Sequence, residues 1–297
     1  MLKGIITAMV TPVDENGQIN QLATQQLIDR LIDKGVHGLF ILGTNGEFHR
    51  LTNQQKIEFM KIVVDYTNHR VPVYAGTGGN CTEEVIQMTK AASEIGVDAV
   101  SVITPYLLAL SQEELYHHYK KIADTSCVPV ILYNIPKNTG NALSPQLVSK
   151  LSQLPNVIGI KDSSGDLENI KKYVEETANE NFSVLVGSDS LILEALKSGA
   201  VGAVAATANV LAKTDLLIYQ LWKRGDLAQA KEVQKSIDAF RAVLKFGTVP
   251  SVLKLAVTNT GIDVGPPIPP VLPLENKEQQ EKIKQVLTSY QRIERID

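Results

Sequence analysis

The sequence predicts an α/β protein, a (β/α)8 TIM barrel followed by a C-terminal appendage of three helices. Short apolar runs rich in β-branched residues recur along the chain, and each precedes a longer stretch with helical periodicity. Eight such runs lie within about 225 residues, as eight βα units of a barrel require. The segment ITAMVTPVD (6–14), which spans the end of the first run, lacks the glycine-rich phosphate loop that usually follows the first strand of a doubly wound sheet. A barrel is therefore favoured over an open sheet.

The eight strand candidates follow one another at the spacing of βα units. They are GIITAMVTP (4–12), GLFILG (38–43), VPVYAGTG (71–78), AVSVITP (99–105), VPVILYNIP (128–136), VIGIKDSS (157–164), FSVLVGSD (182–189) and GAVAATANV (202–210).

Amphipathic segments between these runs predict helices at 52–68, 82–95, 111–125 and 166–178. Several of them open on Ser, Thr or Asp, and Thr52 with Gln55 has the spacing of a capping box. The connections between runs are short, as βα units need.

The alternation stops after Arg224. Helices are expected at 226–246, 248–260 and 275–295, with the proline-rich stretch 264–273 as a rigid extended connector. We therefore expect a barrel catalytic domain over residues 1–225 and a helical region over 226–297 that packs on it.

Composition bounds the function. The 297 residues, 44% of them hydrophobic, can bury a large core. With 21% charged residues and a net charge of −3, no basic patch points to nucleic acid or a membrane surface as partner. The two cysteines form neither a metal-type cluster nor a disulfide framework, and neither a signal peptide nor a membrane span is recognisable. We expect a cytoplasmic enzyme without a metal site.

The motif GTNGE (43–47) follows the second strand candidate directly. It is compatible with an ordinary strand-to-helix turn, in which glycine allows a tight backbone and Thr or Asn caps the next helix. In a barrel, however, active sites form at the carboxyl ends of the strands. There Thr44 and Asn45 offer hydroxyl, amide and backbone N–H donors that suit a small carboxylate.

Lys161 stands in the otherwise apolar strand candidate VIGIKDSS. Alternation places Lys161 and Ser163 on one face of the strand and Asp162 on the other. If the first face looks into the barrel, burial disfavours the ammonium and leaves a neutral amine, a nucleophile toward carbonyls. The alternative is a strand-end lysine that reaches solvent or pairs with Asp162.

Tyr133 ends the preceding strand candidate, so barrel neighbours place it beside Lys161. Its hydroxyl is suited to relay protons, although an ordinary core aromatic has the same pattern. Asp189 is compatible with binding a polyhydroxy substrate or with capping a helix. His117 and His118 are expected in the middle of a helix, on its solvated face, and no metal site is predicted.

Three motifs together resemble the dihydrodipicolinate synthase/N-acetylneuraminate lyase family: GTNGEF (43–48), YNIPKNTG (133–140) and IGIKDSS (158–164). The resemblance extends along the whole chain, including the three helices expected after the barrel. It implies a class I aldolase mechanism on pyruvate, without a separate cofactor, in a homotetramer built as a dimer of dimers.

The same resemblance implies roles for individual residues. Lys161 would form the Schiff base, Tyr133 would relay protons, and Thr44 with Asn45 would bind the pyruvate carboxylate. The carbonyl of Val204 falls where the family aims a backbone acceptor at the bound pyruvyl group.

Departures from the family pattern bear on the second substrate. Synthases and sialate lyases usually carry a second hydroxyl residue at the position of Asn45. An asparagine at this position resembles the pattern of 4-hydroxy-2-oxoglutarate aldolases. Leu107 replaces a tyrosine that reaches across a dimer interface, and Asn138 replaces an arginine that holds the second substrate's carboxylate. Ala206 stands where a hydroxyl usually contacts the sugar chain of sialate-lyase substrates.

We therefore expect a pyruvate-dependent aldolase or lyase that cleaves a 4-hydroxy-2-oxo acid, either a 2-keto-3-deoxy sugar acid or a 4-hydroxy-2-oxoglutarate type, to pyruvate and a small aldehyde. The alternatives are dihydrodipicolinate synthase, which condenses pyruvate with aspartate semialdehyde, and N-acetylneuraminate lyase. A barrel that senses pyruvate or a sugar acid without catalysis is a third possibility, which the presence of both Lys161 and Tyr133 disfavours.

Overall fold

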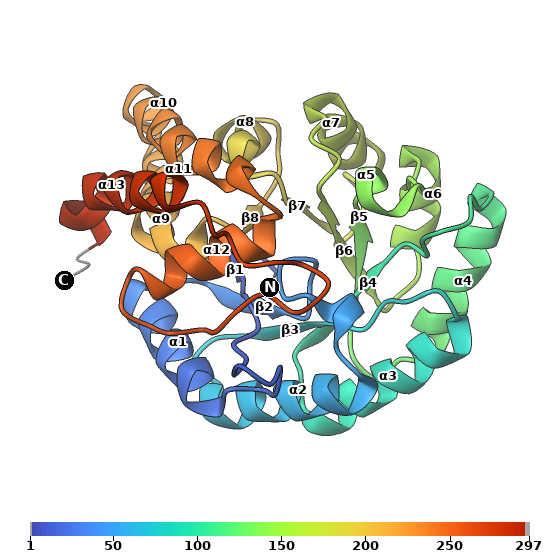
Figure 1. Ribbon diagram of the computed structural model, residues 1–297. Helices are drawn as coiled ribbons and strands as arrows, with labels where there is room; N and C mark the ends of the chain where they lie inside the picture. Colours follow the sequence, from blue (N-terminus) through green and yellow to red (C-terminus); the bar gives the residue numbers. More distant parts are fainter. Residues whose placement is uncertain (1, 295–297) are drawn as a thin grey trace.

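The computed structural model of the protein describes residues 2–294. Eight parallel strands close into a barrel in chain order, and β1 pairs with both β2 and β8. Helices surround the strands (Figure 1), so the predicted (β/α)8 fold is confirmed. The strands are β1 (Gly4–Ala8), β2 (Gly38–Ile41), β3 (Val73–Gly76), β4 (Ala99–Ile103), β5 (Val130–Asn134), β6 (Val157–Asp162), β7 (Ser183–Val186) and β8 (Gly202–Ala205).

Helices fill the connections between strands. At the start of α2, Thr52 and Gln55 form the predicted capping box, in which each side chain accepts a hydrogen bond from the other's backbone N–H. Short 3-10 turns η1 (Phe48–Arg50) and η2 (Asp189–Leu191) follow β2 and β7. The helices up to the end of the barrel are α1 (Gln21–Lys34), α2 (Asn53–Thr67), α3 (Thr82–Ile95), α4 (Gln112–Thr125), α5 (Pro136–Thr139), α6 (Pro145–Ser152), α7 (Leu167–Glu176), α8 (Ile192–Lys197) and α9 (Ala208–Arg224).

The strands are shorter than the apolar runs that predicted them. The run 202–210, for example, contains all of β8 but also the first turn of α9. Its Ala, Thr and Asn residues are compatible with a strand, a turn or a helix start, so periodicity does not mark the boundary. The extra residues at the carboxyl ends form the loops of the barrel mouth.

Two apolar layers hold the barrel together, because successive strand residues point to opposite faces. One layer fills the space between the strands and the surrounding helices. The other fills the inside of the barrel, which is therefore a packed core beneath the mouth. The interior cluster comprises Leu2, Ile6, Ala8, Phe40, Tyr74, Ala99, Ile131, Leu185 and Val204.

The C-terminal region is helical, but its first predicted helix, 226–246, is wrong as a single element. The segment breaks at Ile237 into α10 (Leu227–Ser236) and α11 (Asp238–Val243), and η3 (Leu244–Phe246) follows. Both Ile237 and Phe240 are fully buried. The apolar pattern therefore continues across the break and hides it from a periodicity argument. The remaining helices are α12 (Val249–Thr258) and α13 (Lys277–Glu294).

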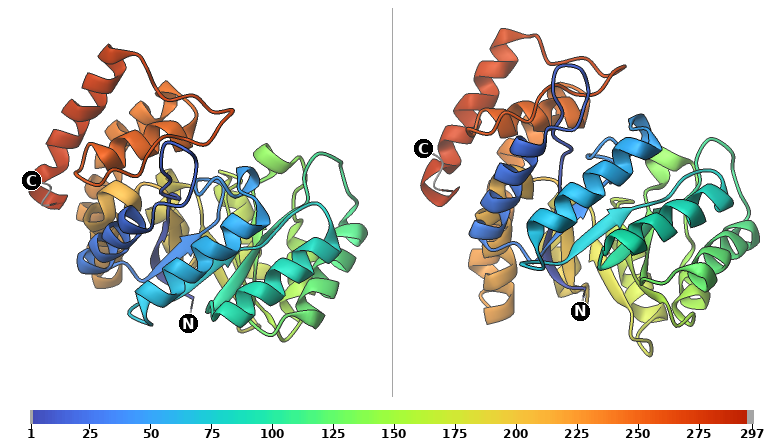
Figure 2. Two further views of the ribbon diagram at one scale, coloured as in Figure 1. Left: turned by 60° about the horizontal axis from the view of Figure 1, so that its bottom comes forward. Right: turned by 90° about the horizontal axis from the view of Figure 1, so that it is seen from below.

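The connector between α12 and α13 lies beside the loop after β1, as both views in Figure 2 show. Val13 N donates to Val264 O at 3.1 Å, which joins the two segments by their backbones. The next residue, Gly265, has a φ of +73°, and a Cβ there would lie 1.8 Å from Val13 O. Only glycine fits this contact.

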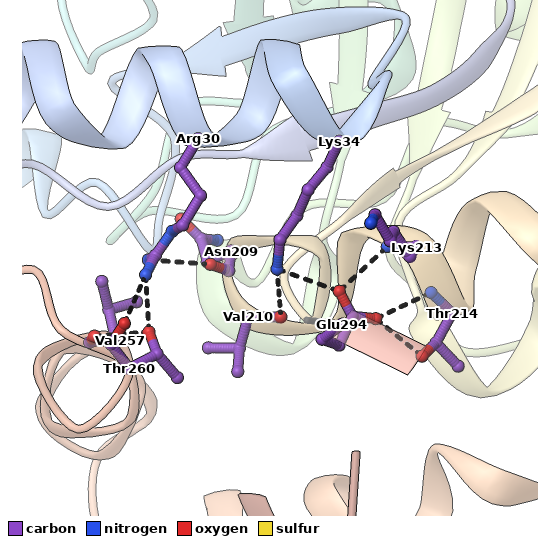
Figure 3. A network of polar contacts seen from close by, with 9 residues as sticks. All are labelled: Arg30, Lys34, Asn209, Val210, Lys213, Thr214, Val257, Thr260 and Glu294. Carbon is purple, nitrogen blue, oxygen red and sulfur yellow. Dashed lines mark hydrogen bonds and ion pairs between the residues drawn. The ribbon is translucent and has the colours of Figure 1, made fainter. Parts of the chain in front are cut away.

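The end of α13 is tied to a break in α9 (Figure 3). Leu211 has non-helical angles within α9 (φ −107°, ψ 40°), which frees backbone N–H groups of the next turn. The buried carboxylate of Glu294 accepts from Lys213 N at 3.2 Å and Thr214 N at 2.8 Å, and pairs with Lys34 Nζ at 3.0 Å. A carboxylate at such a helix start is stabilising, so Glu294 fixes α13 against the barrel.

The prediction of a solvated position is wrong for His118. Its neighbour His117 is exposed, but the His118 side chain is buried and its Nδ1 lies 2.9 Å from Thr82 Oγ1 on α3. The two adjacent residues point in different directions around α4, and only one direction faces solvent.

His118 gives the fold a dependence on pH. Burial lowers the pKa of His118 to about 4 from 6.5. Below pH 6.5 the unfolded chain binds a proton that the folded protein resists, so stability is lost as the pH falls from 7 toward 4. The loss is about 2 kcal/mol by pH 5. In urea unfolding, the stability advantage of wild type over His118→Gln should shrink by that amount between pH 7 and 5. Parallel pH profiles would contradict the assignment; His117→Gln is the matched control.

Candidate active site

A cavity of about 830 Å³ opens at the carboxyl ends of the strands. This volume is in the range usual for small-molecule sites, and the position is that of active sites in this fold. The cavity wall brings together every residue that the sequence put forward for chemistry or binding: Thr44, Asn45, Tyr133, Asn138, Lys161, Ser163, Asp189 and Val204.

Lys161 and Tyr133 form the centre of this cavity. They are register partners across β6 and β5, and their side chains are each 4% exposed. Lys161 Nζ lies 4.0 Å from the centroid of the Tyr133 ring and 4.4 Å from that of Phe40. Ring faces at these distances stabilise a cation, whether ammonium or iminium. The lysine is therefore held inside the barrel, with its amine at the cavity.

The loop after β2 brings a hydroxyl to the same point. Thr44 Oγ1 lies 3.2 Å from Tyr133 Oη, at hydrogen-bond distance. Asn45 is half-buried beside it on the cavity wall. The loop is closely packed: a Cβ on Gly43 would come within 2.9 Å of the Phe40 ring. Thr44, Tyr133 and Lys161, from three strand ends, thus meet in one place.

Glu47, the last residue of GTNGE, does not face the cavity. Its fully buried carboxylate pairs with Lys254 Nζ of α12 at 2.8 Å and with Arg50 NH1 at 3.1 Å. It also accepts from Ile268 N at 2.8 Å. Burial lowers the pKa of Lys254, and the charge of Glu47 partly offsets this. Sequence reasoning missed this residue, which ties the Thr44 loop to the C-terminal region.

Loss of the Glu47 charge should destabilise the protein strongly. Glu47→Gln leaves the buried ammonium of Lys254 without its charged partner, although Lys254 Nζ still donates to Pro266 O at 2.9 Å. Breaking a buried pair in this way costs about 3–5 kcal/mol. Urea unfolding measures the loss. Glu83→Gln, which removes an exposed pair with Lys121, is the control and should cost at most about 1 kcal/mol.

A double variant tests the physical reason. Glu47→Gln/Lys254→Met removes both charges and should recover part of the stability, since no unpaired charge then remains buried. A Glu47→Gln loss no larger than that of the control would show that the pair contributes little.

Ser163 and its neighbour Gly187 shape the wall next to Lys161. A Cβ on Gly187 would lie 2.0 Å from Ser163 Oγ and 3.0 Å from Lys161 Cε. Glycine at the end of β7 therefore leaves room for both side chains. Sequence reasoning noted the GSD motif for its aspartate only, and the need for glycine follows from a contact between strands.

Asp189 lines the cavity, but its carboxylate is already engaged. Its two oxygens accept from Ala206 N and Thr207 N, each at 3.1 Å, just before α9. Burial raises the pKa of Asp189, whereas these two donors and the positive charges of Arg241 and Lys161 act in the opposite direction. The contacts are those of a residue that holds the β8–α9 turn.

Two further predicted positions lie at the mouth or below it. Asn138, on α5, is exposed and borders both the main cavity and a neighbouring one of about 270 Å³. Val204, on β8, is buried in the interior cluster below. Leu107, where the family resemblance leads us to look for a tyrosine, is 88% exposed and borders neither cavity.

Among residues 2–294, no group of three or more His, Cys, Asp or Glu side chains is arranged to hold a metal ion. No helix in this part of the chain is both long and apolar enough to cross a membrane.

A (β/α)8 barrel with a buried lysine and a tyrosine at neighbouring strand ends is compatible with the chemistry of a class I aldolase. The sequence profile of the Dihydrodipicolinate synthetase family matches residues 1–289. The chain therefore belongs to this family. It is an enzyme, a carbon–carbon lyase of the class I aldolase type that works through a lysine Schiff base.

Individual relatives agree with this assignment. The 4-hydroxy-tetrahydrodipicolinate synthase of Methanopyrus kandleri is 36% identical over 288 residues, which cover 96% of this chain and 94% of that protein. The Bacillus subtilis enzyme of the same name is 37% identical over 276 residues, covering 93% and 95%.

Solved structures agree as well. YagE, a prophage protein of the dihydrodipicolinic acid synthase family from E. coli K12 solved in complex with pyruvate, superposes with a TM-score of 0.94 at 31% identity over 100% of both chains. Dihydrodipicolinate synthase DapA-2 of Bacillus anthracis has a TM-score of 0.94 at 36% identity, covering 97% of this chain and 98% of that one.

Proposed function

We propose that this enzyme binds pyruvate as an imine on Lys161 and joins it reversibly to an aldehyde. The observation that carries the proposal is the position of the Lys161 amine, which is buried against the Phe40 and Tyr133 rings on the wall of the cavity. The amine attacks the ketone carbon of pyruvate and water leaves, which gives an iminium. Loss of a proton from the methyl carbon then gives the enamine that bonds to the aldehyde carbon.

The neighbouring residues fit the remaining tasks. Tyr133 would carry the proton between carbinolamine, water and the new hydroxyl, because its ring centroid lies 4.0 Å from Lys161 Nζ on the wall of the same cavity. Thr44 and Asn45 would hold the pyruvate carboxylate through neutral donors. Hydrolysis of the final iminium returns the free lysine and the product. Read backwards, the same steps cleave a 4-hydroxy-2-oxo acid.

Two reactions are candidates, and they differ in the substrate that reacts with or releases pyruvate. The names of the curated relatives favour the condensation with aspartate semialdehyde made by 4-hydroxy-tetrahydrodipicolinate synthases. Asn138 and Leu107 favour the 4-hydroxy-2-oxo acid aldolase instead, since they replace an arginine and a tyrosine expected in synthases. We retain both reactions as candidates, because both begin with the same imine between pyruvate and Lys161.

The test has two parts. Borohydride reduction with pyruvate should add one reduced pyruvyl group to the protein, and peptide mapping should place it on Lys161. Pyruvate release over a panel of 4-hydroxy-2-oxo acids, run beside a condensation assay with aspartate semialdehyde, then separates the two reactions. Absence of any borohydride adduct would end the proposal.

We also propose that the enzyme assembles as a homotetramer, as the family resemblance implies. Leu107 and Leu108 support contact with a second copy, because they are adjacent apolar side chains exposed at 88% and 71%. One solved relative is described as the first monomeric dihydrodipicolinate synthase variant, which makes a monomer an exception.

A further inference from the structure

The wall of the active-site cavity carries more positive charge than pyruvate needs. Besides Lys161, it includes four cationic side chains, whereas Asp189 is the single acid among its lining residues. The chain as a whole has a net charge of −3, so the surplus belongs to the cavity. The four cationic residues are Arg50, Lys137, Arg241 and Lys245.

These four residues differ in how far they are already neutralised. Arg50 is committed to the buried carboxylate of Glu47 at 3.1 Å. Among residues 2–294, Arg241 makes one ion pair, with the exposed Asp238 at 3.2 Å on its own helix, and its charge also acts on the buried Asp189. Within residues 2–294, no acidic side chain lies at ion-pair distance from Lys137 or Lys245. The charges of Lys137 and Lys245 are therefore available to a ligand, and that of Arg241 is available in part.

The three available cations come from two separate parts of the chain. Lys137 lies on α5, directly after β5 and its terminal Tyr133. Arg241 and Lys245 are four residues apart across α11 and η3, a spacing that places them on one side of the helical segment. Figure 1 shows α5 and α11 apart at the rim of the barrel. A single exposed lysine is ordinary, but here three cations from separate parts of the rim line one cavity.

We propose that Lys137, Arg241 and Lys245 recognise an anionic group, a carboxylate or a phosphate, on the aldehyde that reacts with bound pyruvate. This inference rests on the proposed function, since it concerns the second substrate of that reaction. The pyruvate carboxylate has its own neutral donors near Lys161, so these cations are left for a group farther from the reacting carbon. An arginine in place of Asn138 would bring positive charge to this cavity; here the charge comes from α5 and from the C-terminal region instead.

The expected fall in kcat/KM depends on how exposed the cationic side chains are. Lys137 and Lys245 are both exposed, so solvent and salt screen each contact with a substrate anion. Each contact is weaker than a buried charge-assisted hydrogen bond, and the loss of two together should lower kcat/KM for an anionic aldehyde about tenfold.

The experiment compares aldehydes that differ in charge. We would measure kcat/KM for condensation of pyruvate with three aldehydes: succinic semialdehyde and glyceraldehyde 3-phosphate, whose anionic groups lie away from the aldehyde carbon, and neutral glyceraldehyde. The anionic-to-neutral ratio should fall about tenfold in Lys137→Gln/Lys245→Gln and stay at the wild-type value in Lys231→Gln. This control removes an equally exposed charge on α10, away from the cavity. A larger fall for succinic semialdehyde identifies a carboxylate site, and a larger fall for glyceraldehyde 3-phosphate identifies a phosphate site.

Borohydride trapping with pyruvate on the same three proteins separates the possible failures. Normal trapping together with an unchanged ratio in the double variant would overturn the charge recognition and leave the proposed function in place. Absence of trapping in the wild type would overturn both. A fall of the ratio in Lys231→Gln equal to that in the double variant would also overturn the inference, because the effect would then come from net charge.

Discussion

Lys161→Ala is expected to reduce both condensation and cleavage to background. The imine is the electron sink of the proposed mechanism, and no other group at the cavity is placed to supply one. The cavity wall includes two more lysines, Lys137 and Lys245, but both are exposed at its rim. Lys161 alone among the three is buried between ring faces. The measurement is intact-protein mass after borohydride and pyruvate, together with turnover under saturating pyruvate.

Controls separate chemistry from packing in this experiment. Lys161→Arg keeps a long cationic side chain over Tyr133 and Phe40 but cannot form the imine, so it should be as inactive as the alanine variant. Glu47→Gln/Lys254→Met removes another buried lysine together with the charge of its partner; Lys254 does not line the cavity, so this variant should not abolish trapping. An adduct on any lysine other than Lys161, or activity retained in Lys161→Ala, would show that the wrong nucleophile has been identified.

The fold was predictable because its signal is local and repeated. Each βα unit carries its own apolar run, helix and short connection, so eight weak signals support one architecture. Helix boundaries near Ile237 were not predictable, because a turn between two helices that bury the same side leaves the apolar pattern intact. His118 was misjudged for a related reason: the direction of one residue on α4 depends on α3, which packs against it.

The centre of the site was predictable from one geometric rule. Residues at the carboxyl ends of barrel strands converge, so Thr44, Tyr133 and Lys161 could be placed together from their positions in three runs. What the sequence could not reveal are contacts with the C-terminal region, where no strand register applies. Glu47 finds Lys254 on α12, and Arg241 reaches the cavity from α11. No spacing in the sequence indicates either the Glu47–Lys254 pair or the position of Arg241 at the cavity.

The structure changes the interpretation of Asn138, which stands where the family pattern has an arginine. Asn138 lacks the positive charge of an arginine, but Lys137 precedes it on the same wall, and Lys245 lies on that wall too. The missing guanidinium therefore does not make the cavity neutral. With Asn138 in place of the arginine, the cavity still offers positive charge to an acidic second substrate. Asn138 is therefore weaker evidence against the synthase reaction than it is in the sequence alone.

Tyr133→Phe should lower kcat by roughly 10²–10⁴-fold, the usual contribution of a general acid–base group. The change removes only the hydroxyl, which lies 3.2 Å from Thr44 Oγ1, and keeps the ring face beneath Lys161 Nζ. Pyruvate trapping should therefore persist, at a lower rate, because the amine keeps its position while protons move slowly. Tyr74→Phe is the matched control: Tyr74 is also buried inside the barrel but does not line the cavity, so its loss should leave kcat near the wild-type value.

Leu107→Tyr completes the test of the proton relay. Leu107 is exposed and borders neither cavity, so a water or the substrate itself would have to continue the relay beyond Tyr133 in the present enzyme. In that case a new hydroxyl at position 107 should change aldol cleavage little. A large gain would mean that the relay is incomplete without a tyrosine there, and a Tyr133→Phe enzyme within a few-fold of wild type would mean that Tyr133 is not part of it.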